Sequence, residues 1–319
     1  MAADDVLDER DFGLLAAQTY RDLIRDLVSL GAHEVELCGL GEPLLHPRIF
    51  DFLREAKEAG LWVRLVTNAS LLSKEEAQEL IALGLDELHV SLNAATPDTY
   101  ARIHGVAPSV FQRVLDALRA IRQARREANS SRPVVEVSFV VQAGNYHEPL
   151  AWAQTVAAAG AEIITFSALG AAPPTAPVQL SPEQFEAAKR NVSAAVAWAK
   201  SRGLQVRGTF GALAEGGTSF SEHLYAHMPC YIGYIFALVT ASGRLHPCCA
   251  CDRVVGNLRE GGFAAAWRGE TYRTFREEAL DLPNRWQQGS CLPALPGCSC
   301  MSCPYGPWNL EFHQRLHRL

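Results

Sequence analysis

The chain has 319 residues, of which 48% are hydrophobic and 20% charged, a balance that is ordinary for a globular protein with one large core or a core plus a smaller module. Its net charge of −6 argues against a nucleic-acid-binding protein, which would need a basic surface stripe. We expect a cytoplasmic protein without membrane attachment, because no apolar run approaches the roughly 20 residues of a membrane span and the start lacks a signal peptide.

The first half of the sequence repeats one unit, a helix followed by a strand. Apolar residues at helical spacing predict the helices, and short β-branched runs predict the strands. The strands are almost continuously apolar, as expected where both faces of a sheet are covered. Such alternation predicts an α/β protein with a parallel sheet, either open and doubly wound or closed toward a barrel. The expected helices are 15–31, 48–60, 74–84, 109–125 and 147–160, and the strands are 33–39, 62–68, 87–93, 134–142 and 162–169.

The repeat stops at a proline-rich connector, residues 170–184, which leads to one more helix at 182–202 and a strand near 204–210. Beyond it, residues 234–248 predict a hairpin that turns at Gly243, residues 261–280 a short helix, and the remainder an irregular loop. Eight of the nine cysteines lie between Cys230 and Cys303. We therefore expect two domains, residues 1–210 and 211–319.

Polar residues and glycines stand at the carboxyl ends of the predicted strands, where parallel α/β folds place their functional residues. The glycines allow a ligand to approach the backbone, Glu42 can pair with an ammonium group, and Ser91 and Asn93 share one strand face. The alternative is that these residues are only helix caps and turns. In chain order the strand ends are Cys38 to Pro43, Thr67-Asn68, Ser91-Leu92-Asn93, and Gln142 with Asn145.

Three of these segments, "GLGEPLLHP", "LVTNASLLS" and "LDELHVSLNAATPDTYARIHG", resemble in order and spacing the radical S-adenosylmethionine (radical SAM) superfamily. They are most similar to members with a C-terminal SPASM or twitch iron–sulfur domain. The resemblance implies a partial (β/α)6 TIM-like barrel lacking its first strand, plus a small Cys-rich auxiliary-cluster domain. It also implies that Gly39, Gly41, Glu42 and Pro43 hold the methionine amino group, that Ser91 and Asn93 hold the ribose, and that Thr67 and Asn68 line the site.

The resemblance implies an enzyme that cleaves S-adenosylmethionine to a 5′-deoxyadenosyl radical and modifies a peptide or small metabolite by hydrogen abstraction. Its partners would be that substrate and an external electron donor such as flavodoxin or ferredoxin. The alternative is a non-catalytic, degenerate scaffold that binds a peptide or a partner enzyme.

One family motif is missing. Radical SAM proteins place a CxxxCxxC loop before the helix expected at 15–31, where it supplies three thiolates to a [4Fe-4S] cluster, and this sequence has no cysteine there. Cys38 cannot substitute for three ligands, and at the end of a buried strand it is expected to be a small core residue. We expect that the sequence begins downstream of the true start, the alternative being a member that lost its redox chemistry. The chain alone is predicted to be inactive.

The C-terminal cysteines form a second candidate site. The predicted hairpin brings Cys230 and Cys248 to neighbouring strand ends, and the CxxC turn presents Cys300 and Cys303. Four thiolates suit an iron–sulfur cluster or zinc, and plain core or disulfide cysteines remain an alternative. The similarity to SPASM domains favours one [4Fe-4S] auxiliary cluster, with Cys251, Cys291 and Cys298 as possible further ligands.

Three histidines, His46, His89 and His104, fall near the predicted strand ends and turns. Lone histidines on such elements are more often surface or turn residues than ligands, so we assign them no role.

Overall fold

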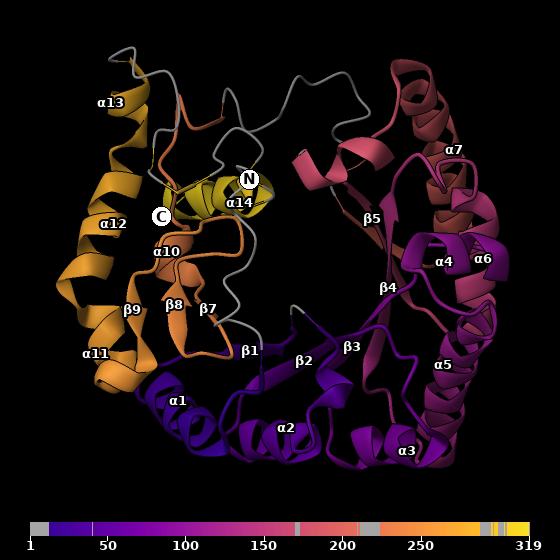
Figure 1. Cartoon of the computed structure of the whole chain (residues 1–319), viewed down its shortest axis with the longest axis horizontal. Helices are drawn as coiled ribbons and strands as arrows, with labels where there is room; N and C mark the ends of the chain where they lie inside the picture. The colour runs from indigo at the N-terminus through magenta and orange to yellow at the C-terminus, as the bar shows by residue number, and fades with distance from the viewer. Residues whose placement is uncertain are drawn as a thin grey trace. The chain divides into compact units, whose positions relative to one another are not determined.

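The computed structural model describes residues 13–39, 41–169, 173–208, 210, 224–287, 295, 297, 298, 303 and 305–318 (Figure 1). The chain divides into two compact units. The barrel unit comprises residues 32–169 and 175–215, and the C-terminal unit comprises residues 1–31, 170–174 and 216–319.

Among its described residues, the barrel unit contains one sheet of six parallel strands whose spatial order follows the sequence. Because the order never reverses and parallel crossovers are right-handed, the connecting helices fall on one face of the sheet. Figure 1 shows these helices along the outer side of the strands. This arrangement is the predicted partial (β/α)6 barrel. The strands are β1 (Glu34–Leu37), β2 (Trp62–Thr67), β3 (Glu87–Ser91), β4 (Val134–Val141), β5 (Ile163–Ala168) and β6 (Gln205–Arg207).

Three helices of the barrel unit, α3, α4 and α7, begin at a residue whose side chain accepts a hydrogen bond from an N–H of the first turn. Ser73 and Glu76 form a capping box at α3, and Ser181 and Gln184 form another at α7. Helix α4, which Thr96 caps, was not predicted from the sequence. The helices are α2 (Ile49–Glu58), α3 (Lys74–Ala82), α4 (Pro97–His104), α5 (Ser109–Glu127), α6 (Pro149–Ala159) and α7 (Pro182–Ser201), with short 3-10 turns η2 (Pro43–Leu45) and η3 (Pro173–Val178).

The two faces of this sheet differ in polarity, so the expectation of apolar residues on both faces is wrong. Side chains such as Val63, Leu65 and Phe139 are fully buried on the face that meets the helices. The opposite face carries charged and polar residues, and paired positions in neighbouring strands put Glu36, Arg64 and Glu87 side by side there. The predicted site residues lie at the carboxyl ends of the strands that form this inner face.

The C-terminal unit contains a three-stranded antiparallel sheet, ordered β7 (Leu238–Val239), β8 (Arg244–His246) and β9 (Gly256–Asn257) among the described residues. The predicted hairpin turn is confirmed, since Gly243 adopts a φ of 88° between β7 and β8. The third strand was not predicted. The helices of this unit are α10 (Ile232–Ile235), α11 (Gly262–Arg268), α12 (Glu270–Leu280), α13 (Leu282–Gln287) and α14 (Gly306–Leu316), and it also contains the 3-10 turn η4 (Leu258–Glu260).

Two predictions for this unit are wrong. The helix expected at 261–280 is two helices, α11 and α12, because the chain is extended at Gly269, with a φ of −65° and a ψ of 161°. The remainder of the chain is not all irregular, since α13 and α14 lie in it.

Helix α1 (Ala17–Ser29) packs in the C-terminal unit although it precedes the barrel in sequence. Leu23 joins the core that contains Phe263 and Leu258, and the Asp26 carboxylate accepts a 2.9 Å hydrogen bond from the N–H of Ala264 in the first turn of α11. The domain boundary near residue 210 stays a prediction. Within the described residues, no helix combines the length and apolarity that a membrane span requires.

Candidate functional site

The loop after β1 brings Glu42 to the end of the strand. Gly39 and Gly41 are exposed, and a Cβ on Gly39 would lie 3.2 Å from the carbonyl oxygen of Gly41, so the loop is tight at that point. Glu42 caps η2, where its Oε1 accepts a 3.0 Å hydrogen bond from the N–H of Leu44. Pro43 follows as the first residue of this turn, a position where no N–H is needed.

The Glu42 carboxylate also bonds to the end of β2. The Thr67 hydroxyl donates to Oε1 at 2.5 Å, and the N–H of Asn68 donates to Oε2 at 2.8 Å. A carboxylate has about four acceptor positions, and the Leu44, Thr67 and Asn68 bonds fill three of them. Among the described residues no other donor reaches this carboxylate, so one position on Oε2 remains for a ligand. The structure brings Gly41, Glu42, Thr67 and Asn68 together, as expected from parallel strand ends.

Tyr100 of α4 is a neighbour of Glu42 that the sequence analysis did not single out. Its side chain is buried, burial raises the pKa of its hydroxyl, and the Glu42 carboxylate adds to the rise. The phenol is therefore a neutral donor or acceptor at physiological pH.

Ser91 and Asn93 lie at the end of β3. Ser91 is paired in register with Ser138 of β4, and both side chains belong to the inner face. The Asn93 Oδ1 accepts a 2.9 Å hydrogen bond from the N–H of Val140, which fixes the side chain and leaves its Nδ2 hydrogens as the donors for a ligand. An amide donor and a hydroxyl two residues apart suit the hydroxyl groups of a ribose.

Two buried residues that the sequence analysis did not assign hold this end of the sheet together. Asn145 is fully buried, and its Nδ2 donates to the carbonyl oxygens of Asn93 and Val140, both at 2.9 Å. Glu148 accepts from the N–H of Ala95 at 2.7 Å and from the Thr99 hydroxyl at 2.6 Å. The polarity of Asn145 after a strand was a visible signal, but Asn93, which it ties to β4, lies 52 residues away in the sequence.

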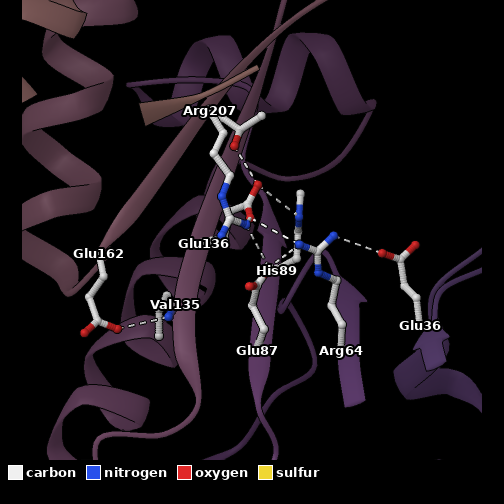
Figure 2. A network of polar contacts seen from close by, with 9 residues as sticks. Glu36, Arg64, Glu87, His89, Val135, Glu136, Glu162 and Arg207 are labelled. Atoms are coloured by element: carbon white, nitrogen blue, oxygen red, sulfur yellow. Dashed lines mark hydrogen bonds and ion pairs between the residues drawn. The ribbon is translucent and has the colours of Figure 1, made fainter. Parts of the chain in front are cut away.

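A network of charged side chains occupies the inner face of the sheet (Figure 2). Arg64 of β2 pairs with Glu36 at 3.1 Å, with Glu87, and with Glu136 at 3.5 Å. Arg207 of β6 pairs with Glu136 at 2.6 Å and with Glu87 at 3.4 Å. The two guanidinium groups thus balance three carboxylates that line one face of the sheet.

His89 lies in this network, so the prediction that it is a surface or turn residue is wrong. The same prediction holds for His104, which is exposed, and for His46, which ends the turn η2. The His89 side chain is 16% exposed, and its Nδ1 lies 3.5 Å from Glu136. Burial lowers the pKa of His89, against the opposing effect of Glu136. The ligand atoms of Glu87, His89 and Glu136 all lie within 4.8 Å of one another, but the arginines already pair with both carboxylates.

The C-terminal unit gathers cysteines in one apolar core. Cys230, Cys248 and Cys251 are buried in it, and Cys298 and Cys303 pack against it. Cys251 and Cys298 face each other across an antiparallel backbone bridge. Burial raises the pKa of Tyr272, and the charges of Cys248 and Cys251 raise this pKa further. Several thiols converging in an apolar core fit an iron–sulfur cluster, which thiolates bind.

Other cysteines lie elsewhere. Of the four predicted cluster ligands, Cys230 and Cys248 lie in the core and Cys303 lies at its edge. The fourth ligand, Cys300, and the further candidate Cys291 fall outside the described residues. Cys249 is exposed. Cys38 is exposed too, so the prediction that it is a core residue is wrong; β1 is at the edge of the described sheet, and fewer elements cover it.

A parallel barrel with polar strand ends, joined in one chain to a module with a thiol-rich core, defines a class of cofactor-dependent protein. The radical SAM superfamily model matches residues 7–135, and the SPASM model, an iron-sulfur cluster-binding domain, matches residues 230–304. The chain therefore contains a radical SAM domain at residues 7–135 and a SPASM domain at residues 230–304. The cofactors of these domains are S-adenosylmethionine and [4Fe-4S] clusters.

Individual relatives cover different shares of the chain. An AdoMet-dependent heme synthase of Methanosarcina barkeri (strain Fusaro / DSM 804) is 26% identical over 83% of this chain and 77% of its own length. A GTP 3′,8-cyclase of Synechococcus sp. (strain CC9902) is 38% identical over 45% of this chain, and the match spans only 44% of that relative.

The fold is similar to that of Streptococcus suis SuiB. The structure of SuiB bound to S-adenosylmethionine has a TM-score of 0.66 and 15% identity, over 93% of this chain and 67% of that one. SuiB bound to its precursor peptide SuiA has a TM-score of 0.65, again at 15% identity, over 92% of this chain and 70% of that one.

Proposed function

We propose that this chain is the S-adenosylmethionine-binding barrel and auxiliary-cluster module of a radical SAM/SPASM enzyme that modifies a peptide or a small metabolite by hydrogen abstraction. The observation that carries the proposal is the Glu42 carboxylate, held between the ends of β1 and β2 by three hydrogen bonds with one acceptor position left. A carboxylate fixed in this way is prepared to accept one N–H of an ammonium group.

The residues at the strand ends would bind the two polar parts of S-adenosylmethionine. Glu42 would accept from the methionine ammonium, and the Gly39–Gly41 backbone, Pro43, Thr67 and Asn68 would border that end. Ser91 and the Asn93 amide would hydrogen-bond the ribose, because Val140 already holds Oδ1 of Asn93. Reductively cleaved, S-adenosylmethionine supplies a 5′-deoxyadenosyl radical that abstracts a hydrogen atom; the electron comes from an external donor such as flavodoxin or ferredoxin.

The C-terminal cysteines would hold the auxiliary [4Fe-4S] cluster. Cys230, Cys248, Cys300 and Cys303 are the proposed ligands, and Cys251, Cys291 and Cys298 are further candidates. The apolar surroundings of Cys230, Cys248 and Cys251 support this role, since they exclude water from the sulfurs.

A peptide is one candidate substrate, because SuiB, whose fold is similar, has been solved bound to a precursor peptide. Heme and GTP appear in the names of the two sequence relatives, so small metabolites remain equal candidates.

A second function is favoured by one observation: the 319 residues contain no CxxxCxxC segment. A non-catalytic scaffold that binds a peptide or a partner enzyme would not need those three thiolates. In either case we expect these 319 residues alone not to cleave S-adenosylmethionine.

The experiment combines calorimetry with an assay for 5′-deoxyadenosine. The 319-residue chain, reconstituted without oxygen, should bind S-adenosylmethionine weakly, near millimolar, because no cluster chelates the amino and carboxylate groups; a Kd of about 1 mM corresponds to about −4.1 kcal/mol. It should release no 5′-deoxyadenosine upon reduction by dithionite.

The two functions separate when the upstream reading frame is sequenced and expressed. An in-frame CxxxCxxC whose addition tightens binding and starts cleavage supports the enzyme. If an extended protein with its full iron content neither binds nor cleaves S-adenosylmethionine, the enzyme proposal is wrong and the non-catalytic scaffold replaces it.

A further inference from the structure

Asn309 of α14 is a buried residue whose side chain forms three hydrogen bonds beside the cysteine-containing core. Its side chain has no exposed surface, its Oδ1 lies 2.6 Å from the N–H of Tyr231, and its Nδ2 lies 3.1 Å from the Tyr225 hydroxyl and 3.0 Å from the carbonyl oxygen of Tyr305. A backbone N–H can only donate and a carbonyl can only accept, so these partners fix which end of the amide is oxygen.

This orientation determines where the Tyr225 proton points. Because Nδ2 of Asn309 donates to the Tyr225 oxygen, the hydroxyl must direct its own hydrogen elsewhere. The Cys303 sulfur lies 3.4 Å from that oxygen, within the range of a hydrogen bond to sulfur. Tyr225 is 1% exposed, and a hydroxyl buried so deeply requires a partner for its proton.

Asn309 thus acts on two of the proposed cluster ligands. It holds the backbone of Tyr231, the residue directly after Cys230, and it orients the hydroxyl that donates to the sulfur of Cys303. Each of these hydrogen bonds joins residues 78 or 84 positions apart in sequence, so only the fold brings the partners together.

A hydrogen bond to a ligand sulfur stabilises the reduced form of an iron–sulfur cluster, which carries one more negative charge, and so raises the reduction potential. We propose that Tyr225, oriented by Asn309, is a positioning residue that donates to the Cys303 thiolate and raises the reduction potential of the auxiliary cluster. This inference rests on the proposed cluster in the C-terminal unit.

The test is a redox titration of the reconstituted chain, followed by electron paramagnetic resonance. Tyr225→Phe removes only the hydroxyl oxygen. We expect an unchanged iron content and a reduced-to-oxidised ratio that falls about tenfold at a fixed potential, which is about 59 mV for one electron.

Tyr231→Phe is the matched control. It also removes a tyrosine hydroxyl from this unit, but that hydroxyl bonds to Nδ1 of His313 at 2.8 Å rather than to a sulfur. The potential of this variant should equal that of the unmodified chain. A Tyr225→Phe potential equal to that of Tyr231→Phe, at full iron content, overturns the inference.

A second variant serves if Tyr225→Phe loses its iron. In Asn309→Asp the carboxylate still accepts from the Tyr231 N–H but cannot donate to Tyr225, whose hydroxyl turns toward the new oxygen and leaves the sulfur. The potential should fall again, and an unchanged potential overturns the inference. If the unmodified chain itself takes up no iron, the proposed cluster fails, and the inference with it.

Discussion

Glu42 and Thr67 are joined by a side-chain hydrogen bond of 2.5 Å across 25 positions of sequence. The bond ties the end of β1 to the end of β2, because parallel strands bring their carboxyl ends to one edge. It shows that the glutamate of the Gly-Glu-Pro turn is also a structural residue, whose loss leaves three donors without an acceptor.

Glu42→Ala should therefore lower both stability and affinity. The donors of Leu44, Thr67 and Asn68 lose their acceptor, which costs about 1–3 kcal/mol when such groups are buried. Affinity for S-adenosylmethionine should fall at least about tenfold, which corresponds to about 1.4 kcal/mol. Urea unfolding and calorimetry measure the two effects. Thr67→Ser, which keeps the donor, should resemble the unmodified chain; undiminished binding by Glu42→Ala would contradict the assignment of the ammonium site.

Asn93→Ala should weaken the binding of S-adenosylmethionine by about 1–2 kcal/mol, the usual effect of a lost polar partner. The physical reason is the loss of the Nδ2 donors that Val140 leaves for the ribose. Calorimetry with S-adenosylmethionine checks it. Asn284→Ala serves as the control, since it removes a single exposed hydrogen bond to Asp281 in the C-terminal unit. If the two variants bind S-adenosylmethionine with equal affinity, Asn93 does not contact the ribose.

Joint Cys300→Ala and Cys303→Ala replacement should abolish iron uptake. The unmodified chain should take up about four irons per chain in anaerobic reconstitution, as one [4Fe-4S] cluster requires. Iron analysis and visible absorption provide the measurement. Cys249→Ala and Cys38→Ala should retain the iron, because both side chains are exposed. Zinc in the purified protein, with no charge-transfer absorption after reconstitution, would identify a zinc site instead.

Acidification should destabilise the chain through His89. Burial lowers the pKa of His89 below its ordinary value of 6.5, so below pH 6.5 the unfolded chain binds a proton that the folded chain excludes. The free energy of unfolding contributed by this residue is therefore present above pH 6.5 and decreases as the pH falls below it, by at most about 1.4 kcal/mol per pH unit. Urea midpoints at pH 7.5 and 5.5 should differ less for His89→Gln. A difference as large as in the unmodified chain would assign the effect to other groups.

Arg64→Met should destabilise the barrel unit by about 3–5 kcal/mol, since it removes one of the two guanidinium groups that pair with the buried carboxylates and leaves Arg207 to balance both. Its partners Glu87 and Glu136 are 5% and 4% exposed in their side chains. Arg119→Ala is the matched control: Arg119 pairs with Asp116 in one helix, and both side chains are about half exposed, at 48% and 61%. Such a surface pair contributes about 0–1 kcal/mol. Chemical unfolding that affected both variants equally would mean that the inner-face network contributes little to stability.

The sequence alone determined the repeating architecture. Helix caps and turns depend on neighbouring residues, so the five helix–strand units and the hairpin at Gly243 could be predicted from the sequence. The strand-end motifs and the cysteine cluster identified the superfamily for the same reason, because each is a short run of residues. Helix α14 was missed, since its segment is preceded by proline and cysteine residues that are typical of a loop.

Only the tertiary structure decided which of these residues meet. The burial of His89, the three bonds of Glu42 and the packing of α1 with the C-terminal unit depend on contacts between segments that lie far apart in the sequence. The Tyr225 to Cys303 hydrogen bond spans 78 positions, and no local pattern carries it. Local chain preferences follow from adjacent residues, whereas burial, hydrogen-bond partners and the resulting pKa shifts arise from the side chains that packing places around a group.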